Sequence, residues 1–293
     1  MSAVASSFFK HIIVYSGPGS YGDNIVKQIG MFDVLNEYRK KEGRPCWKVS
    51  SVGQQDLIPS LQASNPKETL LVIPAGQSSH LEADFSPEQT AYIQHQFLGL
   101  QGGRLYATCG ASYMLSATRE YNGLSVAHPD QRELCIKKSL FPLFEGTAKG
   151  PLCPYPGKQY KVGFYSDAVA VTNGKETCTI YLSGGGSFFL NESGQKVDVL
   201  VKYPKSELIR LGKSPEEWEK WSNAAILAKV GEGTILLSMF HPYYGSKDID
   251  AETYERAFPG CGTNWRAVKA QLSSLDDRMR FVLHSMLHPL EDS

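Results

Sequence analysis

The sequence predicts an α/β protein with a mainly parallel β-sheet flanked by helices and an added antiparallel β elaboration. Strand-like and helix-like patterns alternate over about the first 120 residues, as in a parallel sheet covered on both faces. From about residue 123 to 240, short apolar runs are instead separated by Gly, Pro and Asn, a pattern typical of hairpins. The chain has 293 residues, 42% of them apolar, which is enough for a sizeable core. We expect a single domain over residues 1–293 that carries the β-rich elaboration at about 123–240.

Each element of the alternating part has its own signal. Residues 11–15 are β-branched and aromatic and precede a Gly-Pro-Gly turn, which predicts a buried strand. Apolar residues at helical spacing predict a helix over 25–40. Ser86 suits an N-cap and Pro87 the first helical position, so a helix is expected over 86–98. Further strands are expected over 47–52, 70–74 and 104–107, and a short helix over 111–118.

The second half reads as antiparallel strands followed by a terminal helix. Apolar positions recur with helical period over residues 267–287, which predicts that helix. The strands are expected over 160–164, 168–171, 177–182, 197–203, 224–230 and 234–239.

Composition argues against several classes of partner. Thirty basic residues balance thirty acidic ones, so charge-driven binding to nucleic acid or to an anionic membrane is not expected. The N-terminus lacks the pattern of a secretory signal, and no apolar run approaches a membrane span. We expect a cytoplasmic protein that acts on a small molecule, while secretion without a classical signal stays open. The oligomeric state is not readable from the sequence.

The cysteines and histidines suggest neither a disulfide scaffold nor a metal site. The six cysteines form no CxxC pair and are too sparse for a scaffold, so reduced thiols are expected. His284 and His288 are four residues apart but have no third ligand in view. No cofactor is predicted. The cysteines are Cys46, Cys109, Cys135, Cys153, Cys178 and Cys261.

The strongest local signal is Cys109, which follows a predicted strand and has small neighbours. A nucleophile elbow forces its residue into strained backbone geometry and needs adjacent side chains out of the way. The helix that starts at Gly110 is expected to aim its N-terminal amides at the sulfur and to lower the pKa of the thiol. A buried structural cysteine is the alternative interpretation.

Two further signals follow predicted strands. His241 is followed by a proline and suits a general base that accepts the Cys109 proton and later returns it. Gly76 lies in a Pro-Ala-Gly-Gln turn after the strand at 70–74. The Gly76 and Gly110 N–H groups are expected to form an oxyanion hole. Because carboxyl ends of parallel strands share one edge, the turns after the first, third and fourth strands should meet there.

These motifs together resemble the class I glutamine amidotransferase superfamily, within it most closely the N-terminal domain of eukaryotic-type biotin–protein ligases and its stand-alone bacterial relatives. The resemblance implies a flavodoxin-like sheet and a Cys-His pair at Cys109 and His241. It also places the Gly184-Gly185-Gly186 run near the site. The matching blocks are Val14 to Gly19, Leu71 to Gly76, Ala107 to Tyr113, Tyr181 to Gly186, and His241-Pro242.

The sequence departs from the superfamily at informative positions. Tyr243 stands where the amidotransferases have the Glu that orients the imidazole. Substitutes for that acid are Tyr243 itself, Asp23 and, below them, Asp248. Ala107 and Ala111 replace the two usual elbow glycines. No Gly-Arg-Gly-Arg run occurs and no length remains for a ligase domain, so biotin ligation is not expected.

Two functions remain open at this point. The first is thiol-dependent amide hydrolysis of an unknown substrate by Cys109 and His241. The second is a non-catalytic module that uses the same pocket to bind a small molecule or a protein, which the missing Glu favours. Other residues that we expect to line the pocket are Gly17, Gly19, Gln77 and Gly185, with His80 as a weaker candidate.

Overall fold

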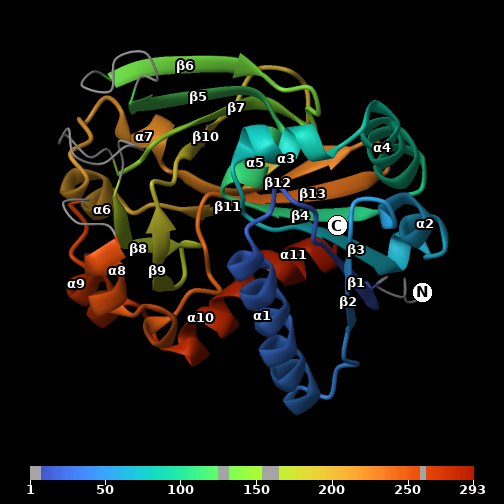
Figure 1. Cartoon of the computed structure of the whole chain (residues 1–293), viewed down its shortest axis with the longest axis horizontal. Coiled ribbons are helices and arrows are strands. Elements are labelled where there is room, and N and C mark those ends of the chain that lie inside the picture. Colours follow the sequence, from blue (N-terminus) through green and yellow to red (C-terminus); the bar gives the residue numbers. More distant parts are fainter. Residues whose placement is uncertain (1–7, 125–131, 154–164, 258–261) are drawn as a thin grey trace.

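The computed structural model describes residues 8–124, 132–153, 165–257 and 262–293 (Figure 1). Its largest feature is a sheet of nine strands among these residues, in the order β2-β1-β3-β4-β13-β12-β11-β8-β9. The bounds in that order are Lys48–Val52, His11–Tyr15, Thr69–Ile73, Arg104–Thr108, Gly233–Ser238, Asn223–Val230, Val197–Lys202, Ser166–Thr172 and Thr177–Ser183.

The first five strands of this order are parallel, and four of them, β2, β1, β3 and β4, were predicted to be so from the sequence. β1 pairs with β2 and β3, and β4 pairs with β3 and β13. The last strand of this parallel part, β13, comes from the segment expected to form only antiparallel strands. It also pairs antiparallel with β12, so it joins the two halves of the sheet. The antiparallel elaboration thus extends the main sheet through β12, β11, β8 and β9.

A second sheet covers one face of the first (Figure 1). Its order is β10-β7-β5-β6, and the pair β5–β7 is parallel while the other two pairs are antiparallel. This sheet was not predicted from the sequence. Its strands are β5 (Ser116–Leu124), β6 (Arg132–Lys138), β7 (Phe144–Gly150) and β10 (Ser187–Phe189).

Helices lie on both faces of the main sheet (Figure 1). α1 and α10 lie on one face, and α3, α4 and α5 lie with the second sheet on the other. The bounds of the α-helices are α1 Gly22–Lys41, α2 Leu57–Gln62, α3 Ser78–Asp84, α4 Pro87–Ala91, α5 Gly110–Met114, α6 Lys205–Arg210, α7 Trp218–Trp221, α8 Ala251–Ala257, α9 Trp265–Gln271, α10 Leu275–Val282 and α11 His288–Glu291. Short 3-10 helices cover η1 Pro66–Glu68 and η3 Ser246–Asp248, and π-helices cover η2 Tyr92–Leu100 and η4 Leu283–Leu287.

Alternate residues of the parallel strands feed two apolar cores. On β1, Ile12 and Val14 belong to the core beneath α1 and α10, whereas Ile13 and Tyr15 belong to the core beneath the second sheet. β3 divides its residues in the same way. Side chains of a strand point alternately to opposite faces, so this division shows that the sheet is buried on both sides.

Two predicted helices differ from the structure. The helix expected over 111–118 ends at Met114, and β5 begins at Ser116, so the β-rich segment starts before the predicted boundary near residue 123. The helix expected over 267–287 is interrupted after Gln271, where Leu272 is extended with φ −60° and ψ 134°. Ser274 then caps a new helix by accepting a hydrogen bond from the Asp277 N–H at 3.1 Å.

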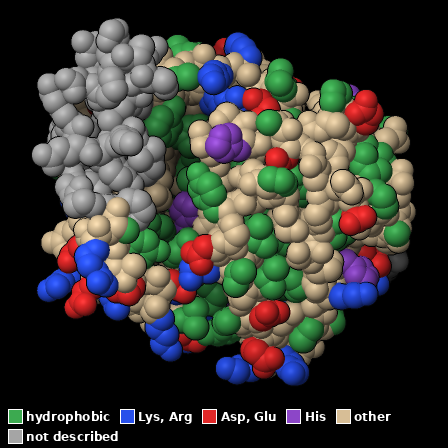
Figure 2. Space-filling view, in the orientation of Figure 1, with side chains coloured by type: hydrophobic (Ala, Val, Ile, Leu, Met, Phe, Trp, Pro, Cys, Tyr) green, Lys and Arg blue, Asp and Glu red, His purple; other side chains and the backbone are tan. Residues whose placement is uncertain are grey.

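Several other predictions from the sequence can be compared with the structure. The helix expected from Ser86 is confirmed, with a capping box between Ser86 and Gln89, and it continues to Leu100. The strand expected over 160–164 lies outside the described residues, as does Cys261. No helix within the described ranges combines the length and apolar character needed to span a bilayer. Basic and acidic side chains are interspersed over the face seen in Figure 2.

Candidate functional site

Cys109 lies on a strained turn between β4 and α5. Its backbone has φ 49° and ψ −114°, and it is the one non-glycine residue with positive φ in the described part of the chain. Such a conformation costs about 1–3 kcal/mol and persists only where neighbours enforce it. Here the Cys109 N–H donates to the Ser238 carbonyl at 2.7 Å, and the Ser112 hydroxyl donates to the same carbonyl at 2.9 Å. The elbow geometry predicted from the sequence is therefore present.

The turns after β1, β3 and β4 pack backbone against backbone. A Cβ atom on Gly110 would lie 1.9 Å from the Gly76 carbonyl oxygen, and one on Gly76 would lie 2.1 Å from the Gly19 carbonyl oxygen. The Gly110 N–H also forms a hydrogen bond with the Cys109 thiol. Small residues at these positions are thus required by contact. The role of Gly76 and Gly110 as an oxyanion hole stays a prediction.

His241 follows β13, the strand next to β4. Its backbone N–H donates to the Tyr181 carbonyl at 3.0 Å, which ties it to β9. The ring is buried, with 5% of the residue exposed. Nδ1 lies 2.9 Å from the Tyr243 hydroxyl, and Nε2 has no hydrogen-bond partner among the described residues. One ring nitrogen is therefore held and the other is available.

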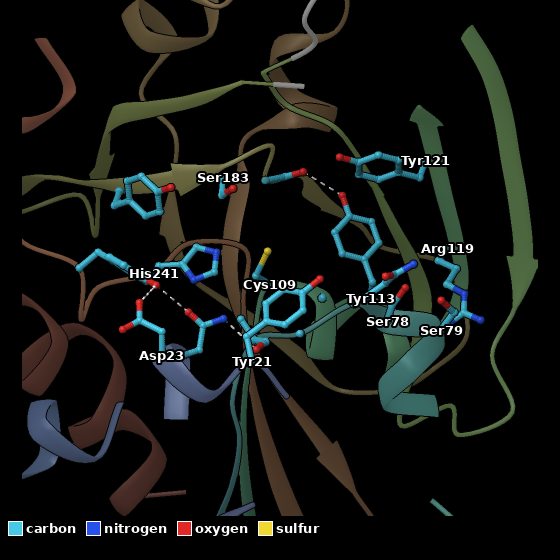
Figure 3. Close-up of a pocket in the computed structure, with 18 of the residues that line it drawn as sticks. Tyr21, Asp23, Ser78, Ser79, Cys109, Tyr113, Arg119, Tyr121, Ser183 and His241 are labelled. Carbon is cyan, nitrogen blue, oxygen red and sulfur yellow. Dashed lines mark hydrogen bonds between the residues drawn. The ribbon is translucent and has the colours of Figure 1, made fainter. Parts of the chain in front are cut away.

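Cys109 and His241 line the same cavity, which has a volume of about 640 Å³. Their side chains lie next to each other in the close-up (Figure 3). The parallel pairing of β4 with β13 places Thr108 opposite Ser238, so the residues that follow both strands emerge at the same edge of the sheet. This is the edge at which the sequence analysis expected the site.

The pKa shifts of this pair differ from the sequence prediction. Although Cys109 is partly exposed, desolvation raises the pKa of its thiol to about 12, and the bond from the Gly110 N–H opposes this only in part. The prediction of a lowered thiol pKa was wrong, because burial outweighs the amide. Burial also lowers the pKa of His241 to about 4. At pH 7 the structure therefore contains a neutral thiol and a neutral imidazole.

Of the substitutes for the missing acid, Tyr243 is the residue that contacts His241. Asp23 lines the cavity but accepts a hydrogen bond from Tyr244 at 2.5 Å and pairs with Lys27 at 3.5 Å. Asp248 is bound to the same lysine, at 2.8 Å. Burial raises the pKa of Tyr243 well above its ordinary value, so its phenol is neutral. No carboxylate in the described part of the chain bonds to the His241 ring.

The other predicted pocket residues divide into two groups. Gln77 and Gly185 line the cavity, and the Gly185 carbonyl accepts a hydrogen bond from Tyr113 at 2.9 Å. Gly17 and Gly19 support the walls instead. A Cβ on Gly17 would lie 1.9 Å from the Tyr15 hydroxyl, and the Gly19 N–H donates to Asp84 at 2.6 Å. His80 is exposed and does not line the cavity.

Most residues of the cavity wall were not predicted from the sequence. Arg119 and Tyr121 come from β5, and Cys135 and Lys137 from β6. These strands were not predicted, although Thr118 and Tyr121 are residue types that favour strands. Aromatic residues that were also missed are Tyr21, Tyr113, Tyr181 and Tyr244. Within the described residues, no group of three or more His, Cys, Asp or Glu could hold a metal ion.

These features define a class: an α/β protein with an elbow thiol and a buried histidine in one pocket at the carboxyl edge of a parallel sheet. Within that class, the chain belongs to the family described as "Biotin-protein ligase, N terminal", whose model matches residues 10–291. The family resemblance drawn from the sequence motifs is thereby confirmed.

Similar proteins cover this chain to different extents. A biotin–protein ligase of Schizosaccharomyces pombe (strain 972 / ATCC 24843) is 27% identical over 183 residues, which are 61% of this chain and 26% of the relative. The chain therefore spans about a quarter of the length of that relative.

Two solved structures are similar only loosely. A glutamine amidotransferase crystal structure has a TM-score of 0.42 and 14% identity, covering 79% of this chain and 90% of that one. A putative ThuA-like protein from Bacteroides uniformis has a TM-score of 0.41 and 9% identity, covering 80% and 82%. Likenesses of this order say nothing about the chemistry of this chain.

Proposed function

We propose that the protein is a cysteine-dependent amide hydrolase in which Cys109 is the nucleophile and His241 is the general base. The observation that carries the proposal is the strained backbone of Cys109, whose thiol shares a cavity with a histidine nitrogen that has no partner among the described residues. Strain of this kind at a cavity wall is characteristic of functional positions. The substrate is a small molecule, and neither nucleic acid nor a membrane takes part.

In the first half of the reaction, the Cys109 sulfur attacks the amide carbon while its proton passes to Nε2 of His241. The N–H groups of Gly110 and Gly76 would donate to the oxyanion that forms. The intermediate collapses as its C–N bond breaks, and the Nε2 proton goes to the departing amine. A thioester on Cys109 remains.

In the second half, water attacks the thioester and gives its proton to Nε2. The C–S bond then breaks, the carboxylic acid leaves, and Nε2 returns the proton to sulfur. Because the resting thiol and imidazole are both neutral, proton transfer must accompany attack in each half. This resembles the logic of a serine hydrolase more than that of a preformed thiolate–imidazolium pair.

The mechanism requires the proton of the neutral imidazole to be on Nδ1, so that Nε2 is free to accept. In that tautomer Nδ1–H donates to the Tyr243 oxygen. A carboxylate would enforce this tautomer because it only accepts, whereas a phenol both donates and accepts. Tyr243 therefore orients the ring but selects the tautomer less strongly.

The proposal is tested with 4-nitrophenyl acetate, which releases a coloured phenolate when it acylates a nucleophile. We expect a burst of up to one phenolate per chain and an acetyl group on Cys109 by mass spectrometry. Cys109→Ala should abolish the burst. The matched control is Cys135→Ala, which removes a second thiol from the same cavity and should leave the burst intact. A burst that survives in Cys109→Ala would contradict the proposal.

The second candidate is a binding module without catalysis. It is favoured by the neutral state of both groups and by the phenol in place of a carboxylate. In that case, ligand affinity measured by calorimetry should be the same in wild type and Cys109→Ala, and no acyl-enzyme should form with any amide or ester.

The proposal also includes a cellular location for the protein. The cysteines Cys46, Cys109, Cys135, Cys153 and Cys178 are free. We place the protein in the cytoplasm, where thiols stay reduced. Biotin transfer is not part of the proposal.

A further inference from the structure

The cavity has a second polar end, built by the second sheet. β5 and β6 pair antiparallel with Arg119 opposite Lys137 and Tyr121 opposite Cys135. All four residues line the cavity that holds Cys109. Since residues two apart on a strand share a face, β5 and β6 present these four side chains to the cavity together. In Figure 3, Arg119 lies with Ser78 and Ser79 on the side away from His241.

Arg119 is a buried cation with unused donors. Only 6% of the residue is exposed. Its Nη2 pairs with Glu82, but Nε and Nη1 have no hydrogen-bond partner among the described residues. Buried N–H groups are nearly always satisfied in folded proteins, and charged ones most of all. Unused donors of a buried guanidinium on a cavity wall therefore point to a ligand that completes them.

The charges at this end of the cavity also do not cancel. Lys137 lies directly across the strand pair from Arg119, and like charges in directly opposed positions repel. Glu82 offsets one of the two cations, and it is itself held by the Leu140 N–H at 2.8 Å. Two cations and one carboxylate leave a single net positive charge. A monoanion would balance it.

The wall between the two ends is aromatic. In the close-up Tyr113 lies between Cys109 and Arg119, with Tyr121 next to Tyr113 (Figure 3). The two tyrosine rings are 5.9 Å apart in an edge-to-face arrangement. Desolvation raises the pKa of Tyr113 well above its ordinary value, so this stretch of wall stays neutral. It suits an apolar or aromatic body.

We propose that Arg119 and Lys137 form a carboxylate-binding subsite, and that the compound bound in this cavity is an amide whose remote end is a carboxylate joined through an apolar body. The assignment of the amide end rests on the function proposed above, whereas the carboxylate subsite is independent of it. The subsite would fix the substrate so that its amide reaches Cys109.

The test compares three probes with a phenylalkyl body by calorimetry: 4-phenylbutyrate, its neutral amide 4-phenylbutanamide, and 4-phenylbutyl phosphate. We expect the carboxylate to bind at least about tenfold more tightly than the amide, as for a charge-assisted hydrogen bond. The preference should weaken as salt concentration rises. Equal affinity for carboxylate and amide would overturn the subsite. Tighter binding of the phosphate would overturn the choice of a carboxylate.

Three variants locate the effect. Arg119→Met combined with Glu82→Gln removes the buried pair together and should abolish the preference for the carboxylate. Lys137→Gln removes an exposed charge and should weaken the preference about threefold. Its matched control is Lys138→Gln, the next residue of β6, whose Nζ donates to Thr118 and which does not line the cavity. A preference reduced equally by both lysine variants would contradict a specific subsite.

The same probes separate this inference from the proposed function. In Cys109→Ala, the preference for 4-phenylbutyrate should persist, because the thiol takes no part in it. If that preference persists while no acyl-enzyme forms in wild type, the subsite stands and the hydrolase proposal fails. If acylation of Cys109 is observed but carboxylate and amide bind equally, the hydrolase stands and the subsite fails.

Discussion

At the scale of single residues, the site depends on how His241 is held. Its Nδ1 contacts a phenol where a carboxylate would give firmer control, and its Nε2 has no partner among the described residues. A phenol–imidazole bond orients the ring but leaves both tautomers accessible. Loss of the phenol hydroxyl should therefore reduce the reaction without ending it.

The first prediction is that Tyr243→Phe slows acylation of Cys109 about tenfold. The change removes the hydroxyl that holds Nδ1 and leaves the ring volume almost unchanged, so the effect should be on ring orientation. The measurement is the burst rate with 4-nitrophenyl acetate. Tyr38→Phe on α1, whose hydroxyl bonds to Asp276 outside the cavity, serves as control. Equal burst rates in Tyr243→Phe and wild type would contradict the role given to Tyr243.

The second prediction concerns the pH dependence of stability. Burial lowers the pKa of His241 to about 4 in the folded state, while an unfolded histidine titrates at about 6.5. Between these values the unfolded state binds more protons, so the free energy of unfolding falls as pH decreases. The full contribution, present above about pH 6.5, is up to about 3 kcal/mol.

A variant of His241 tests whether this residue causes the pH dependence of stability. Urea unfolding between pH 4 and 7 should show a shallower dependence in His241→Gln than in wild type. His288, whose pKa burial also lowers to about 4, adds a similar but smaller slope because it is partly exposed. His80→Gln changes an exposed histidine and serves as control. An unchanged slope in His241→Gln would show that His241 is not the source.

At the scale of elements, the sequence predicted those whose signals are local. The strand at 11–15, the helix at 25–40 and the Ser86 cap all combine apolar periodicity with a start or stop signal, and all are present. The helix expected over 111–118 was too long, because apolar Leu115 continues the helical pattern past Met114, where the helix ends. Arg119 was missed for this reason, since the strand that carries it was not foreseen.

The terminal helix was predicted to be continuous but is interrupted in the structure. Its apolar period runs through Leu272 to Leu275, but Ser274 offers a side-chain acceptor that begins a new helix there. Local capping competed with periodicity and prevailed. A serine within a helical pattern is therefore a signal that deserves a test.

The third prediction follows from that cap. Ser274→Ala should lower the free energy of unfolding by about 1 kcal/mol, because the Asp277 N–H loses its acceptor. Ser50→Ala on exposed β2, where the hydroxyl makes one long bond of 3.5 Å, should change stability by less than about 0.5 kcal/mol. Urea unfolding of both variants provides the comparison. No difference between them would mean that the cap contributes nothing.

At the scale of the whole molecule, the C-terminal helix is fastened to the opposite end of the sheet from the site. Arg39 on α1 and Glu291 on α11 form a fully buried ion pair at 2.8 Å. Arg104, at the start of β4, donates to the Leu290 carbonyl at 2.9 Å. One end of β4 thus anchors the C-terminal helix, and the other end leads to Cys109.

The fourth prediction is that Glu291→Gln lowers the free energy of unfolding by about 3–5 kcal/mol, since it leaves the buried guanidinium of Arg39 without a counter-charge. The control is Glu68→Gln, which breaks a surface pair with Lys10 and should cost at most about 1 kcal/mol. Denaturant unfolding measures both. Similar losses in the two variants would contradict the distinction between buried and exposed pairs.

Long-range pairing was the part of the fold that the sequence could not provide. Short apolar runs predicted the strands near 168–171, 177–182 and 224–230, but such runs do not specify partners. The attachment of β13 to β4, and the formation of a separate sheet by β5, β6, β7 and β10, depend on contacts between distant segments. The residues of the site divide in the same way, into those that local motifs predict and those that strand pairing places. Cys109 and His241 lie in local motifs, whereas Arg119 and Lys137 face the cavity only because of tertiary pairing.

The two-sheet construction of the cavity also bears on how relatives of this protein could diverge. The thiol lies on a turn that packs backbone against backbone with its neighbours, so a larger residue at Gly110 or Gly76 would clash. The opposite wall includes two strands, β5 and β6, each of which contributes two side chains to the cavity. A library randomised at 119, 121, 135 and 137 would therefore sample new ligands while sparing the elbow. By the same reasoning, two chains that share every motif around Cys109 need not share a substrate.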